Sequence, residues 1–314
     1  MRDHGGNLDA ARASWGGADW IDLSTGINRV PYPLPAIPEA AWTVLPTQTA
    51  FDGFVAAARA AYGTQAALLP VAGAQAAIQL VPRLGRPGRA RVLGPTYNEH
   101  AAALRAAGWA VDQVATLAQL NGADLAVVVN PNNPDGQSFA PEALRALKVG
   151  RLIVDESFAD PTPALSLAAH ARDSLLVLRS FGKFYGLAGV RLGCVIGGAD
   201  SIAALAAMAG PWAVSGPALA VGTIALQDRA WAAATTARLT AETQRLDAAA
   251  ARAGWSLVGG TALFRLYDTP DATAAQDHLA RAAIWSRIFP YSTRWLRLGL
   301  PGSLAEWARV EAAL

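Results

Sequence analysis

The chain has 314 residues, of which 53% are hydrophobic and 16% are charged. A charged share below the roughly 25% of an average globular protein, with a high apolar share, excludes a disordered chain. The net charge of +2 and the lack of a basic run argue against a nucleic-acid partner. Because there is no secretory signal and no apolar run of about 18 residues, we expect a cytoplasmic protein without a membrane partner.

Residues that bind metals or form disulfides are few. The single cysteine, Cys194, excludes a disulfide framework and a cysteine-based metal site, and the four histidines are scattered, so we expect no metal. Lysine is also rare, since only Lys148 and Lys183 occur among 26 basic residues. A biased genomic base composition is one explanation for this scarcity.

The chain up to residue 215 predicts a large α/β domain after an arm. Residues 1–45 are rich in Gly, Pro and Trp and show little periodicity, which indicates the arm. Apolar runs then alternate with helical stretches, which indicates a mainly parallel sheet covered on both faces. The predicted strands are 67–71, 90–93, 125–129, 152–154, 175–178 and 192–196. The predicted helices are 51–62, 74–84, 98–107 and 141–147.

The remainder of the chain predicts a smaller α/β domain. Residues 217–253 form an Ala-rich helical stretch, with a break expected near Asp228. Short strands are predicted at 256–258, 263–266, 284–288 and 295–300, and helices at 272–282 and 303–313. We therefore expect a large domain over 46–215 and a small domain over 216–314. The arm of residues 1–45 is expected to be part of the small domain.

Polar residues follow the predicted strands at one edge of the sheet. They are Gln75, Tyr97, Asn133, Asp155 and Ser180. Ligands of such sheets bind outside the carboxyl ends of the strands, so this edge is the expected site.

Two residues at or next to this edge suggest chemistry. Lys183 lies among glycines and aromatic residues just after a buried strand, where it is either a Schiff-base lysine or a lysine that reaches solvent at the sheet edge. Asp155 ends a buried strand and needs a cationic partner, for which a protonated pyridine would serve. A helix cap or an ion pair with an arginine is the alternative for Asp155.

The segment Gly73–Gln75 begins a helix, where free backbone N–H groups and the helix dipole suit a phosphate. Ser180 and Arg191 could add a hydroxyl and a guanidinium to the same group. Tyr97 could stack on an aromatic ring, or it could be a half-buried core tyrosine.

Taken together, these positions resemble a known family. Asp155 after one strand, Ser180-x-x-Lys183 after the next, and Arg191 eight residues later resemble the fold-type-I enzymes that use pyridoxal 5′-phosphate (PLP). The turn Asn130–Gly136 is similar to that of the histidinol-phosphate aminotransferase branch. The resemblance covers nearly the whole chain and implies an α/β PLP-dependent transferase fold, with a large domain of mainly parallel sheet and a smaller α/β domain.

The resemblance also implies roles. Lys183 would form the Schiff base and move protons, and Asp155 would pair with the pyridinium nitrogen. Asn133 would bind the ring 3-oxygen and Tyr97 would stack on the ring. The implied cofactor-binding residues are Ala74, Gln75, Tyr97, Asn133, Asp155, Phe158, Ser180, Lys183 and Arg191, of which Ala74, Gln75, Ser180 and Arg191 would hold the phosphate.

Within that family, the segments 4–7 and 22–28 resemble the L-threonine-O-3-phosphate decarboxylases of cobalamin biosynthesis. Phe158, where most related aminotransferases carry a tyrosine, is similar to the same branch. The implied reaction converts L-threonine O-3-phosphate into (R)-1-amino-2-propanol O-2-phosphate and CO₂. The implied substrate-binding residues are Arg297, which would grip the α-carboxylate, and Arg287, His4, Asn7, Gly26 and Asn28. A surface arginine is the alternative for Arg287, and a disordered terminal residue is the alternative for His4.

Other functions stay open at this point. One is an aminotransferase acting on a phosphorylated substrate such as histidinol phosphate, and another is a non-catalytic PLP-fold subunit of a corrinoid-pathway complex. A nicotinamide-binding fold is disfavoured because no Gly-x-Gly-x-x-Gly follows the early strands. The resemblance further implies a homodimer and contact with a cobinamide synthase. Leu45-Pro46 replaces the Tyr-Pro whose tyrosine reaches the neighbouring subunit in related aminotransferases.

Overall fold

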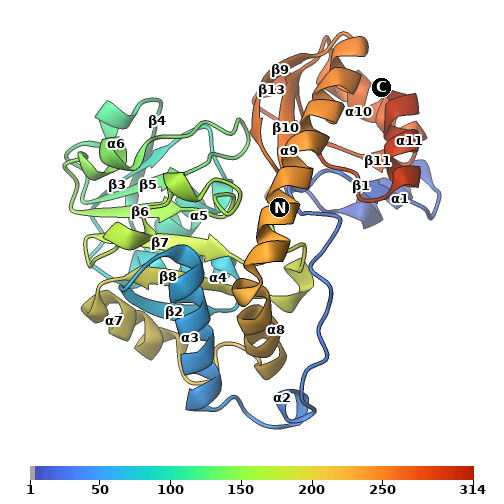
Figure 1. Ribbon diagram of the computed structural model, residues 1–314. Coiled ribbons are helices and arrows are strands. Elements are labelled where there is room, and N and C mark those ends of the chain that lie inside the picture. Colours follow the sequence, from blue (N-terminus) through green and yellow to red (C-terminus); the bar gives the residue numbers. More distant parts are fainter. Residues whose placement is uncertain (1–3) are drawn as a thin grey trace. The chain divides into compact units, whose positions relative to one another are not determined.

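The computed structural model describes residues 4–314. The chain divides into two compact units, whose elements are labelled in Figure 1. Unit 1 comprises the residues up to Pro31, together with Pro134–Gln137 and Ala232–Leu314, and unit 2 comprises Tyr32–Asn133 and Ser138–Trp231. The domain division predicted at residues 45 and 215 stays a prediction.

Unit 2 contains a seven-stranded sheet in the order β2-β8-β7-β6-β5-β3-β4. The strands are β2 (Ala67–Val71), β3 (Arg89–Leu93), β4 (Ala110–Val114), β5 (Leu125–Val129), β6 (Arg151–Asp155), β7 (Leu175–Ser180) and β8 (Gly193–Gly197). The neighbours from β4 to β7 run parallel, whereas β8 is antiparallel to both β2 and β7. The predicted mainly parallel sheet is therefore confirmed.

Unit 2 also contains helices. They are α2 (Ala40–Thr43), α3 (Gln48–Tyr62), α4 (Ala74–Leu80), α5 (Asn98–Ala106), α6 (Pro141–Arg145), α7 (Ala199–Ala209) and α8 (Gly216–Gln227). Short 3₁₀ turns are η1 (Val81–Arg83), η2 (Leu117–Leu120), η3 (Pro163–Leu165), η4 (Ala168–His170) and η5 (Ala188–Val190). Helices α3 and α8 lie side by side (Figure 1).

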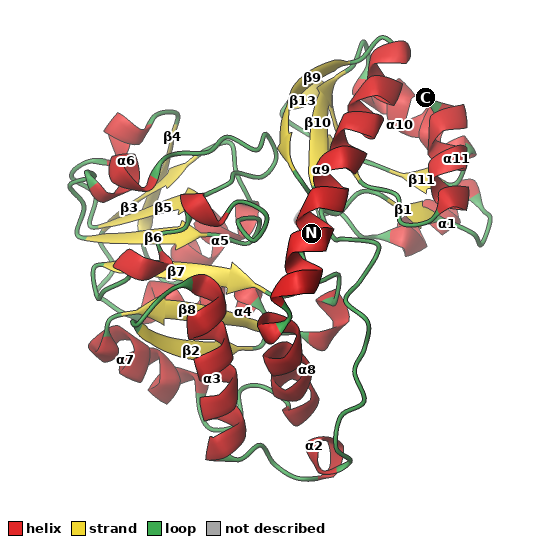
Figure 2. Cartoon of the chain, in the orientation of Figure 1, coloured by secondary structure: helices red, strands yellow, loops and turns green. Residues whose placement is uncertain are grey.

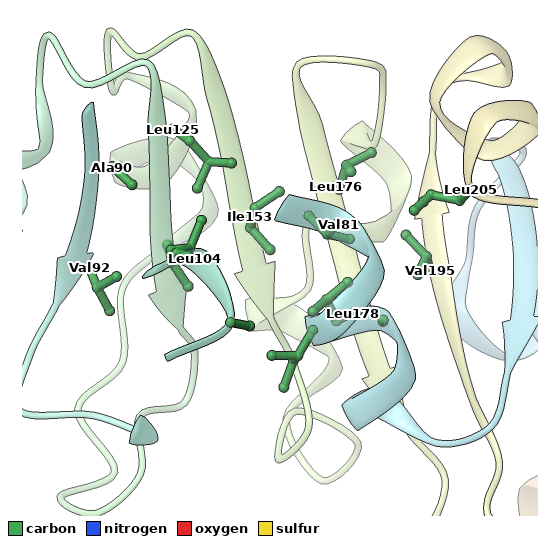
Figure 3. Close-up of a cluster of buried hydrophobic side chains, with 14 of the residues drawn as sticks. Val81, Ala90, Val92, Leu104, Leu125, Ile153, Leu176, Leu178, Val195 and Leu205 are labelled. Carbon is green, nitrogen blue, oxygen red and sulfur yellow. The ribbon is translucent and has the colours of Figure 1, made fainter. Parts of the chain in front are cut away.

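The apolar run of β5 explains why this sheet is the core of unit 2. All five of its positions are buried, because side chains pack against both of its faces. On one face, Leu125 lies near Leu104 of α5, while Leu205 of α7 lies near Val195 of β8 (Figure 3). A sheet buried in this way holds its strand ends rigidly, so side chains that follow the strands are fixed in position.

Unit 1 contains a four-stranded antiparallel sheet in the order β12-β13-β10-β9 and a parallel pair, β1 with β11 (Figure 2). Its elements are α1 (Leu8–Trp15), β1 (Ile21–Asp22), α9 (Arg229–Arg252, which begins in unit 2), β9 (Ser256–Thr261), β10 (Phe264–Asp268), α10 (Ala272–Arg281), β11 (Ile284–Trp285), β12 (Arg287–Phe289), β13 (Ser292–Gly299) and α11 (Leu304–Ala313). Among residues 4–314, no helix is both long and apolar enough to cross a membrane.

Local signals explain which element predictions hold. The break near Asp228 is confirmed, because its carboxylate accepts a hydrogen bond from Trp231 N at 2.9 Å where α9 begins. The single strand predicted at 284–288 is wrong, since β11 pairs with β1 while β12 pairs with β13. The arm is not irregular throughout: α1 forms within it, capped by Asn7, which accepts from Ala10 N at 3.1 Å.

Candidate active site

One cavity of about 210 Å³ lies in unit 2 where β5, β6 and β7 end. All nine residues predicted to bind the cofactor line it. They are Ala74, Gln75, Tyr97, Asn133, Asp155, Phe158, Ser180, Lys183 and Arg191, together with Ile78, Val129 and Ser157. Residues up to 117 positions apart in the sequence are thus brought to one place by the strand order of the sheet.

The wall at the start of α4 is built to receive an anion. Gly73 precedes this helix with φ of +78°, and a Cβ on it would lie 2.5 Å from Nη2 of Arg191. Arg191 has a left-handed backbone (φ +55°) and donates from Nη1 to Ala188 O at 2.9 Å, which fixes its guanidinium beside the helix start. A helix N-terminus beside a guanidinium and the Ser180 hydroxyl is a favourable environment for a phosphate.

Asp155 is held as a carboxylate by two neighbours. Its Oδ2 accepts from Nε2 of His100 at 2.8 Å, and its Oδ1 accepts from the backbone N of Ser157 at 3.0 Å and from its Oγ at 2.5 Å. Burial raises the pKa of the Asp155 carboxyl, but the hydrogen bonds from His100 and Ser157 outweigh burial and bring the pKa below its ordinary value. An ionised carboxylate therefore persists in a buried position, where it can stabilise a positive charge.

Lys183 lies on the turn that follows β7 and is half-buried. Its Nζ is 5.7 Å from the centroid of the Phe158 ring. The turn is tight, because a Cβ on Gly182 would lie 2.8 Å from Ala188 Cα and Gly186 N donates to Lys183 O at 3.1 Å. The amine is therefore carried by a constrained segment rather than by a solvated surface.

Tyr97 and Gln75 form a second polar group on the cavity wall. The Tyr97 hydroxyl donates to Gln75 Oε1 at 3.3 Å, and Gln75 Nε2 donates to Glu99 Oε2 at 3.0 Å. The Tyr97 ring meets His100 edge-on, with centroids 6.2 Å apart. These contacts fix both the tyrosine ring and the glutamine amide.

A buried ionic network lies next to these residues in the sequence. Glu156 follows Asp155, and Arg179 precedes Ser180. Because side chains alternate along a strand, Arg179 points away from Ser180 and donates to Glu156 at 2.9 Å and to Asp160 at 2.7 Å. This network ties the ends of β6 and β7 together behind the cavity.

The six residues predicted to bind the substrate all belong to unit 1. Arg297 on β13 is buried and donates to Ser24 O at 2.7 Å, while Arg287 on β12 stands opposite it in the strand register. Burial, followed by the charge of Arg287, lowers the pKa of the Arg297 guanidinium to about 10. Two like charges therefore face one another in this sheet.

The remaining predicted substrate residues differ in their surroundings. Asn28 is buried and accepts from Arg238 at 2.8 Å and from Val30 N at 3.1 Å. Gly26 is buried and His4 is exposed. Asn7 is exposed, and its side-chain oxygen Oδ1 caps α1 by accepting from Ala10 N at 3.1 Å.

Sequence reasoning missed two polar residues of the cavity region. His100 follows Tyr97 by three residues in the first turn of a helix, so the two share a face, and this spacing was the available signal. Ser157 follows Asp155 by two residues, which is the spacing at which a serine can donate to a carboxylate.

Comparison with known proteins agrees with this geometry. The model of the family "Aminotransferase class I and II" matches residues 47–313. The chain belongs to the class I and II aminotransferase family. It is 48% identical to the threonine-phosphate decarboxylase of Pseudomonas aeruginosa PAO1, an alignment that covers 100% of this chain and 97% of that protein. It is 46% identical to a threonine-phosphate decarboxylase of a Sinorhizobium species, over 99% of this chain and 97% of that protein.

A solved structure shares the fold of this chain. The histidinol-phosphate aminotransferase of Sinorhizobium meliloti, in complex with pyridoxal 5′-phosphate, has a TM-score of 0.80 at 21% identity and covers 98% of this chain and 92% of that chain. The family resemblance and the fold class predicted from the sequence are both confirmed.

The cofactor of the family, PLP, fits the cavity. Gly73 leaves space that a Cβ would fill, beside the Arg191 guanidinium, and this matches the phosphate. The buried carboxylate of Asp155 matches the pyridine nitrogen, and the amine of Lys183 matches the aldehyde. The donors and the acceptor thus agree in kind with the three polar ends of the cofactor.

Proposed function

We propose that the protein decarboxylates L-threonine O-3-phosphate, with PLP as cofactor, and releases CO₂ and (R)-1-amino-2-propanol O-2-phosphate. The observation that carries this function is the likeness to two threonine-phosphate decarboxylases at 48% and 46% identity over essentially the full length of both chains. The reaction would belong to cobalamin biosynthesis, where the product supplies the aminopropanol linker of the corrinoid nucleotide loop.

Bound PLP supplies an electron sink for the bond that breaks at Cα of the substrate. Asp155 holds a negative charge for the pyridine nitrogen, because His100 and Ser157 keep its carboxyl ionised. Lys183 would hold the cofactor aldehyde through its ε-amine, and Lys183 or a water would deliver a proton to Cα of the substrate. In this proposal Ala74, Gln75, Ser180 and Arg191 hold the cofactor phosphate.

Phe158 bears on the choice of reaction. It lies in the cavity where most related aminotransferases carry a tyrosine that donates to the ring 3-oxygen. A phenyl ring donates no hydrogen bond, so Asn133 becomes the main side-chain partner of that oxygen. This substitution is shared with the decarboxylase branch and supports decarboxylation.

The two facing arginines of unit 1 support a substrate with two anionic ends. Arg287 and Arg297 lie opposite one another, and like charges in such a cross-strand pair repel. A dianion such as L-threonine O-3-phosphate would relieve that repulsion. We assign the carboxylate to Arg297, through a bidentate pair, and the phosphate to Arg287. His4, Asn7, Gly26 and Asn28 complete the proposed substrate site.

Two measurements separate this proposal from its alternatives. Protein mixed with PLP and L-threonine O-3-phosphate should release CO₂ and aminopropanol phosphate; amino transfer that needs a 2-oxo acid would instead indicate an aminotransferase. Borohydride should trap PLP on a peptide that contains Lys183, and failure to do so would indicate a non-catalytic subunit.

The proposal includes an assembly state and a location. We propose a cytoplasmic homodimer that contacts a cobinamide synthase of the same pathway. The side chain of Leu45, which replaces the tyrosine of related aminotransferases, is 60% exposed and offers no hydroxyl to a neighbouring subunit. Sedimentation velocity of the protein at micromolar concentration tests the homodimer, and a monomer would contradict it.

A further inference from the structure

Five aromatic side chains gather around the turn that carries Lys183. We call this cluster the aromatic clasp, and its members are Tyr32, Phe181, Phe184, Tyr185 and Trp231. Three of them, Phe181, Phe184 and Tyr185, lie within two residues of Lys183 in the sequence. The other two stand where the chain passes between the units, because Tyr32 is the first residue of unit 2 and Trp231 is its last.

Three rings of the aromatic clasp form a continuous stack, and the other two meet it edge-on. Phe181 stacks on Tyr185 with centroids 4.4 Å apart, and Tyr185 stacks on Trp231 with centroids 5.5 Å apart. Tyr32 meets Trp231 edge-on at 5.1 Å, and Phe184 meets Trp231 edge-on at 5.5 Å. Offset-stacked and edge-on arrangements are the favoured geometries for aromatic pairs, so the stack resists rearrangement.

Hydrogen bonds fix the two distant members of the aromatic clasp. Tyr32 N donates to Tyr185 O at 2.8 Å, which joins the backbone of the Lys183 turn to the segment after Pro31. Asp228 accepts from the Tyr32 hydroxyl at 3.3 Å and from Trp231 N at 2.9 Å. The Asp228 carboxylate therefore binds both the first and the last residue of unit 2.

Burial shows which side of the turn the aromatic clasp occupies. Phe181, Phe184 and Tyr185 are 2%, 1% and 4% exposed, whereas Lys183, between them, is half-buried and lines the cavity. The flanking rings thus anchor the turn from within unit 2 while the amine faces the cavity. The position of the amine depends on the anchor, because the turn is only a few residues long.

We propose that Trp231 and Tyr32 are positioning residues for Lys183. Through the aromatic clasp they fix the turn so that the ε-amine meets the cofactor aldehyde in one orientation. The same contacts link that orientation to the first and last residues of unit 2, at Pro31/Tyr32 and Trp231/Ala232. This proposal rests on the role of Lys183 given above.

The test compares Trp231→Leu and Trp231→Phe with Trp212→Leu. Trp212 is a matched control because it lies in the same unit, outside the aromatic clasp, and is 54% exposed. Three quantities are measured: amide hydrogen exchange of residues 181–187 without and with PLP, the pH titration of the absorbance of the bound cofactor, and kcat and KM.

We expect Trp231→Leu to speed exchange in this turn, to shift the midpoint of the absorbance titration, and to lower kcat about tenfold or more with little change in KM, since small misplacements of a reacting group are costly. Trp231→Phe, which keeps a ring, should restore most of each quantity. Trp212→Leu should behave as the wild type.

Two outcomes overturn the proposal. One is exchange in the turn equal to that of the Trp212→Leu control. The other is faster exchange with an unchanged absorbance titration, which would show that the aromatic clasp stabilises the fold without positioning the amine. If Trp231→Leu does not fold, Tyr32→Leu gives the same comparison. Amide hydrogen exchange measured without PLP tests the aromatic clasp whether or not the proposed function is right. Borohydride trapping of PLP on Lys183 of the wild type tests the proposed function and not the aromatic clasp.

Discussion

Removing the guanidinium of Arg179 should destabilise the protein strongly. The Arg179→Met variant keeps the length of the side chain but leaves Glu156 and Asp160 without their cation. All three side chains are at most 7% exposed, and the guanidinium also lies 4.3 Å from the centroid of the Tyr62 ring. Breaking a buried pair of this kind costs about 3–5 kcal/mol, because the remaining charge is desolvated and uncompensated.

The loss of stability in Arg179→Met should grow as the pH rises. Burial raises the pKa of Glu156 and of Asp160 even in the wild type, and Arg179 opposes that rise. Without Arg179 both values rise further, so the folded chain holds protons that the unfolded chain releases. When the pKa of a group is higher in the folded state than in the unfolded state, the free energy of unfolding is unaffected at low pH and falls as the pH rises. The fall is up to about 1.4 kcal/mol per pH unit for each group.

Urea unfolding at pH 5.5 and pH 8 measures both effects. Arg172→Met is the matched control, because Arg172 is exposed and donates to Ser174 Oγ at 3.0 Å. We expect Arg179→Met to unfold at a lower urea concentration than the control, and we expect this difference in midpoint to be larger at pH 8 than at pH 5.5. Adding Glu156→Gln and Asp160→Asn should recover part of the loss. A midpoint equal to that of the control, or a deficit that shrinks as pH rises, would refute the reasoning.

The other predictions concern the cofactor. Lys183→Arg should abolish turnover, because a guanidinium stays protonated and cannot form the imine, whereas Lys148→Arg, at an exposed position, should keep full activity; steady-state rates of both variants check this. Gly73→Ala should weaken PLP binding about tenfold or more, for two reasons. The new Cβ would lie 2.5 Å from the Arg191 guanidinium, and a backbone φ of +78° is strained for any residue that carries a Cβ. Gly53→Ala is the control, because no atom lies within 4 Å of the new Cβ, and this variant should bind PLP as the wild type does. Titration of each cofactor-free protein with PLP measures both affinities.

The sequence predicts the sheet of unit 2 and the residues of its cavity well, for a physical reason. A strand such as β5 is apolar at all five positions, so its ends are visible in the sequence. The ends of parallel strands share one edge of the sheet, so residues such as Asp155 and Lys183 can be predicted to lie together. Their site roles stay predictions until the variants above are measured.

Other features depend on partners that no local pattern reveals. His100 meets Asp155 across 55 positions, and Tyr32 meets Tyr185 across 153, so neither contact leaves a periodic signal. The run 284–288 is apolar enough for one strand, but its two halves pair with different strands on either side of Ser286. Pairing of this kind is decided by tertiary packing.

The most direct test of the central claim uses L-threonine O-3-phosphate labelled with ¹⁴C in its carboxylate. The protein loaded with PLP, with no 2-oxo acid present, should release labelled CO₂ in equal amounts with aminopropanol phosphate. Lys183→Arg should release none. Retention of the label in the substrate, or loss of its amino group only when a 2-oxo acid is supplied, would contradict the account.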